Sequence, residues 1–187
     1  CNIFLLQDTS HWRRYSQTRL DEAHNLRLLS YFCYGILAMK DGQQHVFDCL
    51  RGLNVEFDRY EHPPIGTVAE AEIHWQGIDA VHCKNLFLRN QKGNRHYLIV
   101  VGHLKRVDLR LLASQIGDGK LTFASPARLM KWLGLAPGSV SPFGLLNDVT
   151  RHVSLFIDTD LRRAERITFH PNENTSTLAL RFVDFEA

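Results

Sequence analysis

Hydrophobic and polar positions follow regular periods from about residue 41 to the end of the chain. Between residues 55 and 60 they alternate, which is typical of a half-buried strand. Before this strand, apolar residues recur at helical spacing and Gly52 stands near the end of a short helix. After it, Thr67 lies three residues before Glu70, a capping-box spacing that predicts a helix to about residue 75.

The clearest pair of strands covers residues 80–89 and 95–101. The five residues between them suit a hairpin loop in which Gly93 takes a positive φ angle. Two helices follow, over residues 108–116 and 127–133, because each ends at a glycine and the second is preceded by a capping serine and a first-turn proline.

The remaining pattern sets the fold class. Three further strands follow, over residues 153–157, 166–169 and 177–183. Helices and strands therefore mix without a regular βαβ repeat, and the sequence predicts an α+β domain with a mixed sheet over residues 39–187. Residues 1–38 have only a patchy helical pattern. We expect an N-terminal extension there, either a helix docked on the domain or sequence upstream of a natural start at Met39.

Composition and charge limit the partners. Lys and Arg total 22 among the 187 residues and Asp and Glu total 20, so the formal net charge is +2. A protein that coats nucleic acid or an anionic membrane has a one-sided charge, so we expect no DNA partner, no membrane partner and only local contact with RNA. The four cysteines show no CxxC spacing, which favours reduced thiols in a cytoplasmic protein.

Lys84 is the first candidate for chemistry, because it stands inside the apolar run 83–88 and is followed by the amide Asn85. A buried ammonium group costs several kcal/mol, so this lysine must reach water, an anion or a set of carbonyls. The alternative is an edge-strand lysine that points to solvent, since alternation places Asn85 and Phe87 on the opposite face.

The segment from Ala136 to Gly144 contains two glycines and two prolines among small residues. Such a loop exposes backbone N–H groups that bind a carboxylate, a phosphate or a carbonyl oxygen; the alternative is a rigid connector. It matches neither a phosphate-binding loop nor a dinucleotide fingerprint, so we expect no ATP, no NAD and no other cofactor. Ser139 lacks the second glycine of a nucleophile elbow, which disfavours covalent catalysis.

His170 is the third candidate, because it ends a predicted strand just before a turn, where functional side chains often lie. The alternative is a structural or solvated histidine. None of the ten histidines forms a metal pair with helical spacing, so no metal site is predicted.

In this order the segments closely resemble the YbaK/ProX aminoacyl-tRNA deacylases, a family also found as the editing insertion of bacterial prolyl-tRNA synthetases. The resemblance runs from about Met39 to Glu186 and is nearest to the free-standing ProX/PrdX branch, which clears alanine from tRNA(Pro). The residues that carry it are Lys84-Asn85-Leu86-Phe87-Leu88, Val107-Asp108-Leu109, Phe123-Ala124-Ser125, Pro137-Gly138-Ser139-Val140-Ser141-Pro142-Phe143-Gly144 and His170-Pro171-Asn172.

The resemblance implies a mixed, partly barrel-like sheet flanked by helices, and hydrolysis of the ester that joins a mischarged amino acid to the 3′-terminal adenosine. It implies that Lys84 lies by the terminal phosphate or the substrate carbonyl and that Asn85 orients a partner. It also implies that the loop binds the amino acid and that His170 lines the pocket. The loop residues concerned are Gly138, Ser139, Val140, Ser141 and Pro142.

The amino acid and the partners remain open at this stage. The resemblance implies Ala-tRNA(Pro) as substrate, and its alternatives are another mischarged tRNA, carrying Cys or Ser, and a non-catalytic tRNA-binding module of the same fold. The expected partner is the acceptor end of tRNA(Pro), with prolyl-tRNA synthetase as a second candidate. A cluster of cations is a candidate tRNA surface or simply a solvated face; its members are Arg89, Lys92, Arg95, Lys105, Arg106 and Arg110.

Overall fold

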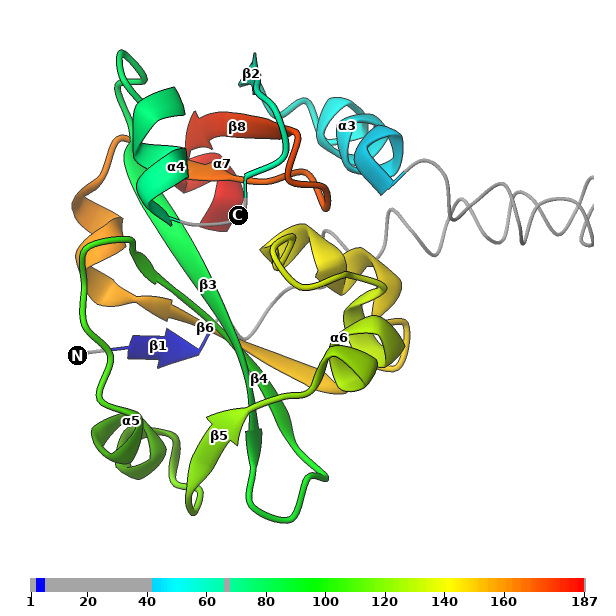
Figure 1. Cartoon of the computed structure of the whole chain (residues 1–187), viewed down its shortest axis with the longest axis vertical. Helices are drawn as coiled ribbons and strands as arrows, with labels where there is room; N and C mark the ends of the chain where they lie inside the picture. Colours follow the sequence, from blue (N-terminus) through cyan, green and yellow to red (C-terminus); the bar gives the residue numbers. More distant parts are fainter. Residues whose placement is uncertain (1–2, 6–41, 66–67, 187) are drawn as a thin grey trace, which may run out of the picture.

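The computed structural model describes residues 3–5, 42–65 and 68–186, which form an α+β fold around one mixed sheet (Figure 1). The strand order is β1-β6-β4-β3-β7-β8-β2, and β5 pairs with β3 outside this path. The strands are β1 (Ile3–Leu5), β2 (Phe57–Glu61), β3 (Val81–Asn90), β4 (His96–Gly102), β5 (Leu121–Phe123), β6 (Val153–Asp158), β7 (Arg166–Phe169) and β8 (Ser176–Arg181).

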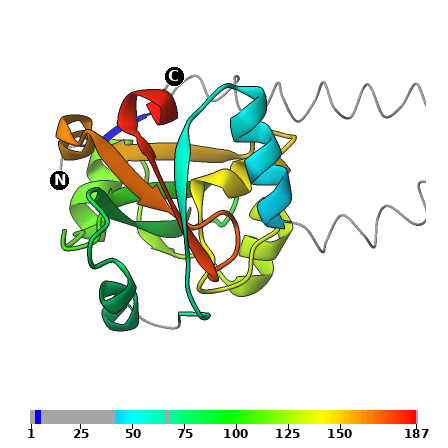
Figure 2. The same ribbon diagram turned by 90° about the horizontal axis from the view of Figure 1, so that it is seen from above.

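Helices cover both faces of the sheet. Figures 1 and 2 place α3, α6 and η2 on one side of β3 and β4, and α4 and α5 on the other. The helices are α3 (Gly42–Gly52), α4 (Val68–His74), α5 (Leu109–Ile116), α6 (Pro126–Leu133) and α7 (Phe182–Glu186), with 3₁₀ helices η2 (Pro142–Asn147) and η3 (Thr159–Arg163).

The sheet is mixed, as the sequence predicts. β4 pairs with β6 and β3 with β7 in parallel, whereas the other strand pairs are antiparallel. β1 and β2 stand at the two ends of the strand order, so the described strands form an open sheet flanked by helices rather than a closed barrel. The α+β class is confirmed.

Local signals place most elements correctly. The predicted hairpin is β3 and β4, and Gly93 in its loop has φ 70°. Gly117 and Gly134 end α5 and α6 in the left-handed region, and the Ser125 side chain accepts a hydrogen bond from the backbone N–H of Arg128. Glycine lacks the Cβ that makes this region costly, which explains why these residues stop the helices.

Two parts of the chain differ from the prediction. The last strand ends at Arg181 and not at residue 183, because Phe182 and Phe185 turn into the core as the short helix α7. β1, inside the segment predicted as an extension, pairs antiparallel with β6. Residues 6–38 and the predicted start at Met39 lie outside the described residues.

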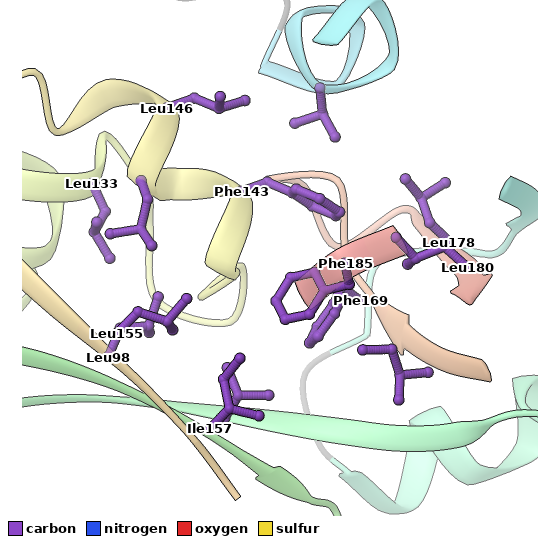
Figure 3. Packing of buried hydrophobic residues seen from close by; sticks show 14 of the residues in the cluster. Leu98, Leu133, Phe143, Leu146, Leu155, Ile157, Phe169, Leu178, Leu180 and Phe185 are labelled. Atoms are coloured by element: carbon purple, nitrogen blue, oxygen red, sulfur yellow. The ribbon is translucent and has the colours of Figure 1, made fainter. Parts of the chain in front are cut away.

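The larger hydrophobic core fills the space between the sheet and the side that carries α3, α6 and η2. Figure 3 shows Phe143, Phe169 and Phe185 at its centre. The ring centroid of Phe169 lies 5.9 Å from that of Phe143 and 4.7 Å from that of Phe185. A second, smaller core under α5 contains Leu88 and Leu112. Burial of these side chains fixes the sheet against both helical layers.

β3 is the strand that positions the candidate site. One of its edges pairs with β4 from Cys83 to Arg89. The other edge pairs with β7 only at its beginning and with β5 only at its end, through residues 81–82 and 88–90. Between these points, residues 83–86 have no strand partner on that edge among the described residues. This gap lies at the segment that the sequence singled out.

Candidate active site

β3 turns alternate side chains to opposite faces of the sheet. Phe87 packs in the larger core and Leu88 in the smaller one. The alternation places Asn85 on the face of Phe87 and Lys84 on the face of Leu88. The two predicted catalytic side chains therefore leave the strand on opposite sides, as the sequence pattern predicts.

The face that carries Lys84 becomes polar where β3 meets β7 and β8. His82 Nδ1 lies 3.0 Å from Oγ1 of Thr168, and His62 Nε2 lies 3.0 Å from Oγ1 of Thr177. The His170 ring stands at 68° to the His62 ring, with 5.7 Å between their centroids. We call this group of hydroxyl and imidazole side chains the polar face.

The Lys84 ammonium group is available for a ligand. Its side chain is half-buried, and no described residue gives it a hydrogen bond or an ion pair. Its pairing partner on β4 is the fully buried Val101. β3 and β7 pair in parallel through Val81 and His82 only, with His82 opposite Thr168. Lys84 and His170 each follow that last pair by two residues along the chain, and that they share a site stays a prediction.

The surroundings of His170 favour its neutral form. Its Nδ1 lies 2.9 Å from the carbonyl oxygen of Ser176, and since a carbonyl only accepts, Nδ1 carries a proton; in the neutral form the lone pair is therefore on Nε2. Burial lowers the pKa of His170; the Ser176 carbonyl acts in the opposite direction, and His62 adds to the lowering. The free Nε2 can therefore accept a hydrogen bond from a substrate or a water molecule.

The glycine- and proline-containing loop is tied to both β3 and His170. Asn85 Nδ2 donates a 2.8 Å hydrogen bond to the carbonyl oxygen of Val140. Ser141 Oγ donates a 2.6 Å hydrogen bond to the carbonyl oxygen of His170 and accepts one of 3.2 Å from the backbone N–H of Phe143. Asn85, Ser141 and the Val140 carbonyl thus hold the loop in place.

The other loop residues have distinct environments. Gly138 has φ 87° and is exposed, and a Cβ placed there would lie 3.6 Å from Asn174 Nδ2. Ser139 and Pro142 are buried, and Pro142 begins η2. The exposed backbone at Gly138 is the part of the loop that a ligand can approach closely.

Several polar residues of the site were not predicted from the sequence. His62, Thr168 and Thr177 line the polar face, and the alternation along β7 and β8 was the signal that could have identified the two threonines. Asn172 has φ 66°, and its Oδ1 is buried without a hydrogen-bond donor. The Oδ1 of Asn85 is buried in the same way. Both oxygens can accept a hydrogen bond.

The predicted cluster of cations is divided in the structure. Lys105 Nζ lies 2.8 Å from Oδ1 of Asp158 and also pairs with Asp160, so its charge is already balanced. Arg89 donates to the carbonyls of Asn90 and Gln91 at the hairpin. The exposed members are Lys92, Arg95, Arg106 and Arg110.

The described residues contain neither a metal-binding cluster nor a membrane-spanning helix. Over residues 42–65 and 68–186 no three His, Cys, Asp or Glu side chains are grouped so that they could hold a metal ion. No helix in the described part of the chain is long and apolar enough to cross a bilayer.

Comparison with known proteins identifies the family. The aminoacyl-tRNA editing domain matches residues 62–187. The prolyl-tRNA editing protein ProX of Acetoanaerobium sticklandii is 42% identical over 78% of this chain and 89% of its own. The prolyl-tRNA synthetase associated domain-containing protein 1 of Bos taurus is 33% identical over 73% and 81%.

A solved structure supports the same fold. A protein crystallised as a candidate trans-editing enzyme for prolyl tRNA synthetase superimposes with a TM-score of 0.59 at 21% identity, over 75% of this chain and 86% of that one. At that identity the similarity concerns the fold alone. The family match and the two relatives decide the assignment: the chain belongs to the aminoacyl-tRNA editing domain family.

Proposed function

We propose that this protein is a trans-editing hydrolase that deacylates mischarged Ala-tRNA(Pro). The observation that carries the proposal is the half-buried Lys84 ammonium group, which no described residue pairs, beside the polar face that includes His170, whose pKa is lowered by burial. The similarity to a prolyl-tRNA editing protein supports tRNA(Pro) as the carrier.

The reaction requires few catalytic groups from the protein, because an aminoacyl ester is already activated. The oxygen of a water molecule bonds to the ester carbonyl carbon and the water gives up a proton. The bond from that carbon to the ribose oxygen breaks, the ribose oxygen takes up a proton, and alanine and tRNA with a free hydroxyl leave. The ammonium group of Lys84 stabilises the negative charge of the developing oxyanion or of the terminal phosphate. Neither a metal ion nor a covalent nucleophile is required, and the neighbouring ribose hydroxyl can help to activate the water.

The loop and His170 supply binding and selection. Exposed backbone at Gly138 approaches the amino acid closely, and Ser139, Val140, Ser141 and Pro142 shape the pocket around it. A pocket sized for a methyl side chain excludes the proline ring by steric clash. Glycine and serine are harder to reject, because one methylene supplies only about 1–3 kcal/mol of discrimination.

The proposed partner is the acceptor end of mischarged tRNA(Pro), and prolyl-tRNA synthetase is a second proposed partner. A pocket for one aminoacylated adenosine agrees with the small net charge of +2. We also propose a cytoplasmic location, which suits the free thiols of Cys49 and Cys83. The deacylase domain is proposed to span residues 39–187.

The test is alanine release from Ala-tRNA(Pro) by the full chain and by Lys84→Ala. We expect the variant to lose at least about tenfold in kcat/KM, because removing one donor from an oxyanion site typically costs about a hundredfold or more. Lys120→Ala, at an exposed lysine before β5, is the matched control and should keep the wild-type rate. Equal rates for wild type and Lys84→Ala would refute the role of Lys84.

A panel of Ala-, Ser- and Cys-charged tRNAs identifies the amino acid. The proposal expects the highest kcat/KM with alanine. A higher value with serine or cysteine would keep the deacylase chemistry and replace the substrate. Tight binding of tRNA without release of any amino acid would instead indicate a binding module.

A further inference from the structure

Three aromatic rings are grouped near Lys84, and none of them has been given a role in binding the substrate. Trp75, which follows α4, lies parallel to His82 of β3, with 4.3 Å between ring centroids and 4° between ring planes. His103, after β4, meets Trp75 edge-on with a centroid distance of 5.1 Å. Each of the three side chains is partly exposed. We call them the aromatic triad.

The aromatic triad borders the candidate site directly. His82 and Lys84 are two residues apart on β3 and leave it on the same face, so their side chains are about 7 Å apart along the strand. Thr168 Oγ1, at 3.0 Å from His82 Nδ1, fixes the orientation of the imidazole. The parallel Trp75–His82 pair therefore stands in a defined position next to the free ammonium group.

The triad offers flat surfaces and little charge. Burial, together with His103, lowers the pKa of His82 to about 4, so the imidazole is neutral near pH 7. An uncharged stack of this kind does not attract a phosphate group. It suits another flat ring, because every nucleobase has a π-face that stacks on aromatic side chains. The exposed apolar side chains of Ile73 and Leu104 stand beside the triad in the sequence, 66% and 80% exposed.

We propose that Trp75, His82 and His103 form a stacking site for the terminal adenine of the aminoacylated substrate. The inference rests on the proposed function, because it places the ester of the same nucleotide at Lys84. The base of that nucleotide is one ribose away from the ester, which agrees with the separation of His82 and Lys84 along β3. The triad would then supply binding that does not depend on the amino acid.

The test compares two small substrates: the alanyl ester of adenosine, and the alanyl ester of a ribose that lacks the base. Trp75→Leu should lower kcat/KM for the adenosine ester between about fivefold and 150-fold, the equivalent of about 1–3 kcal/mol per stacked base, mainly through KM. The same variant should hydrolyse the base-free ester at the wild-type rate. For the adenosine ester, the kcat/KM of Trp75→Phe, which keeps an aromatic ring, should lie between those of wild type and Trp75→Leu.

The matched control is Trp132→Phe. Trp132 also stacks on a histidine, His152, with 3.5 Å between centroids and 10° between planes, but it belongs to α6 on the other side of the sheet (Figure 1). We expect this variant to hydrolyse both esters like the wild type. Equal losses on both esters in Trp75→Leu, or no loss on either, would overturn the stacking site. A thermal melt identifies a variant that has failed to fold. In that case His82→Phe, which keeps a stacked pair of rings, is the second variant compared on the two esters.

A binding measurement separates this inference from the proposed function. Titration of the full chain with adenosine 5′-monophosphate should quench tryptophan fluorescence in wild type and in Trp132→Phe, but not in Trp75→Phe. If neither ester is hydrolysed and quenching still depends on Trp75, the proposed function fails and the base site stands. If the esters are hydrolysed and no quenching depends on Trp75, the base site fails alone.

Discussion

The Asn85 side-chain amide donates a 2.8 Å hydrogen bond to the carbonyl oxygen of Val140, which ties β3 to the loop 55 residues farther along the chain. The bond also fixes which end of the amide faces the loop, because a carbonyl accepts and cannot donate. Asn85 Oδ1 is therefore the buried atom without a donor. One residue holds the loop and presents a free acceptor beside it.

Asn85→Asp tests this arrangement with almost no change in shape. The aspartate has no N–H to donate, and it places a carboxylate oxygen against the Val140 carbonyl. We expect a loss of about 1–3 kcal/mol in the free energy of unfolding, because buried partners are left unpaired. The kcat/KM for alanine release from Ala-tRNA(Pro) should also fall, by a factor that corresponds to at least the same free energy. Urea unfolding and steady-state kinetics measure the two effects.

The control for this variant is Asn94→Asp in the hairpin loop. Asn94 Oδ1 accepts a 2.9 Å hydrogen bond from Asn90 Nδ2, and an aspartate can accept the same bond. We expect wild-type activity and stability. An Asn85→Asp protein that behaves like Asn94→Asp would show that the bond to Val140 does not hold the loop.

Ser141→Ala should destabilise the protein. The hydroxyl is fully buried, donates to the His170 carbonyl and accepts from the Phe143 N–H, so the alanine removes two hydrogen bonds that join this turn to the strand end at His170. The expected loss is about 1–3 kcal/mol, measured as a lower thermal midpoint. Ser139→Ala provides a comparison within the same loop, because its hydroxyl forms no hydrogen bond to any described residue. Equal midpoints for the two variants would contradict this role of Ser141.

The sequence predicts the features that depend on residues close together along the chain. The β3–β4 hairpin and the ends of α5 and α6 depend on glycine, a capping serine and alternation, all of which act over a few residues. The opposite faces of Lys84 and Asn85 follow from the same alternation. The three-residue strand β5 and the 3₁₀ helix η2 carry too short a pattern to be recognised in this way.

The residues that surround the candidate site could be identified only from the structure. His62 and Thr177 are 115 residues apart and meet only because β2 pairs with β8. Trp75 stacks on His82 because α4 folds over that face, and no spacing along the chain predicts the contact. The sequence names Lys84, the loop and His170 through a family resemblance; tertiary pairing supplies their neighbours.

Gly138→Ala should strain the loop without crowding it. The glycine has φ 87°, where a residue with a Cβ costs about 1–2 kcal/mol. The new Cβ would lie 3.6 Å from Asn174 Nδ2, an ordinary contact, so the penalty is conformational. We expect reduced kcat/KM and a lower free energy of unfolding. Gly138→Asn should recover part of both, because asparagine tolerates this region better; a worse result with asparagine would indicate steric exclusion.

A histidine pair at the base of the hairpin predicts how stability depends on pH. Arg128 Nη1 lies 3.1 Å from His96 Nε2, and because a guanidinium only donates, Nε2 accepts and Nδ1 carries the proton. That Nδ1 lies 2.8 Å from His152 Nε2, which must accept in turn. An added proton on Nε2 of His96 would face the donating Arg128 guanidinium. The hydrogen bonds of His96 therefore favour its neutral form.

Acid should consequently weaken the fold. Burial first, then His152 and the cations Arg128, Arg89 and Lys131, lower the pKa of His96 from 6.5 to about 4. Between these values the unfolded chain binds the proton and the folded chain does not, so stability is complete above pH 6.5 and is lost as the pH falls toward 4. The loss from this one group reaches about 3 kcal/mol.

Urea unfolding of wild type and His96→Gln at intervals from pH 7.5 to 4.5 tests this prediction. A glutamine amide can donate to His152 and accept from Arg128, but it cannot take up a proton in this range. We expect the variant to lose stability less steeply between pH 6.5 and 4.5, with the remaining slope due in part to His82, whose pKa is also lowered to about 4. His74→Gln, at an exposed histidine of α4, should keep the wild-type slope. If His96→Gln and the wild type lose stability in parallel, His96 takes up its proton in the folded protein and the proposed hydrogen-bond order from Arg128 to His152 is wrong.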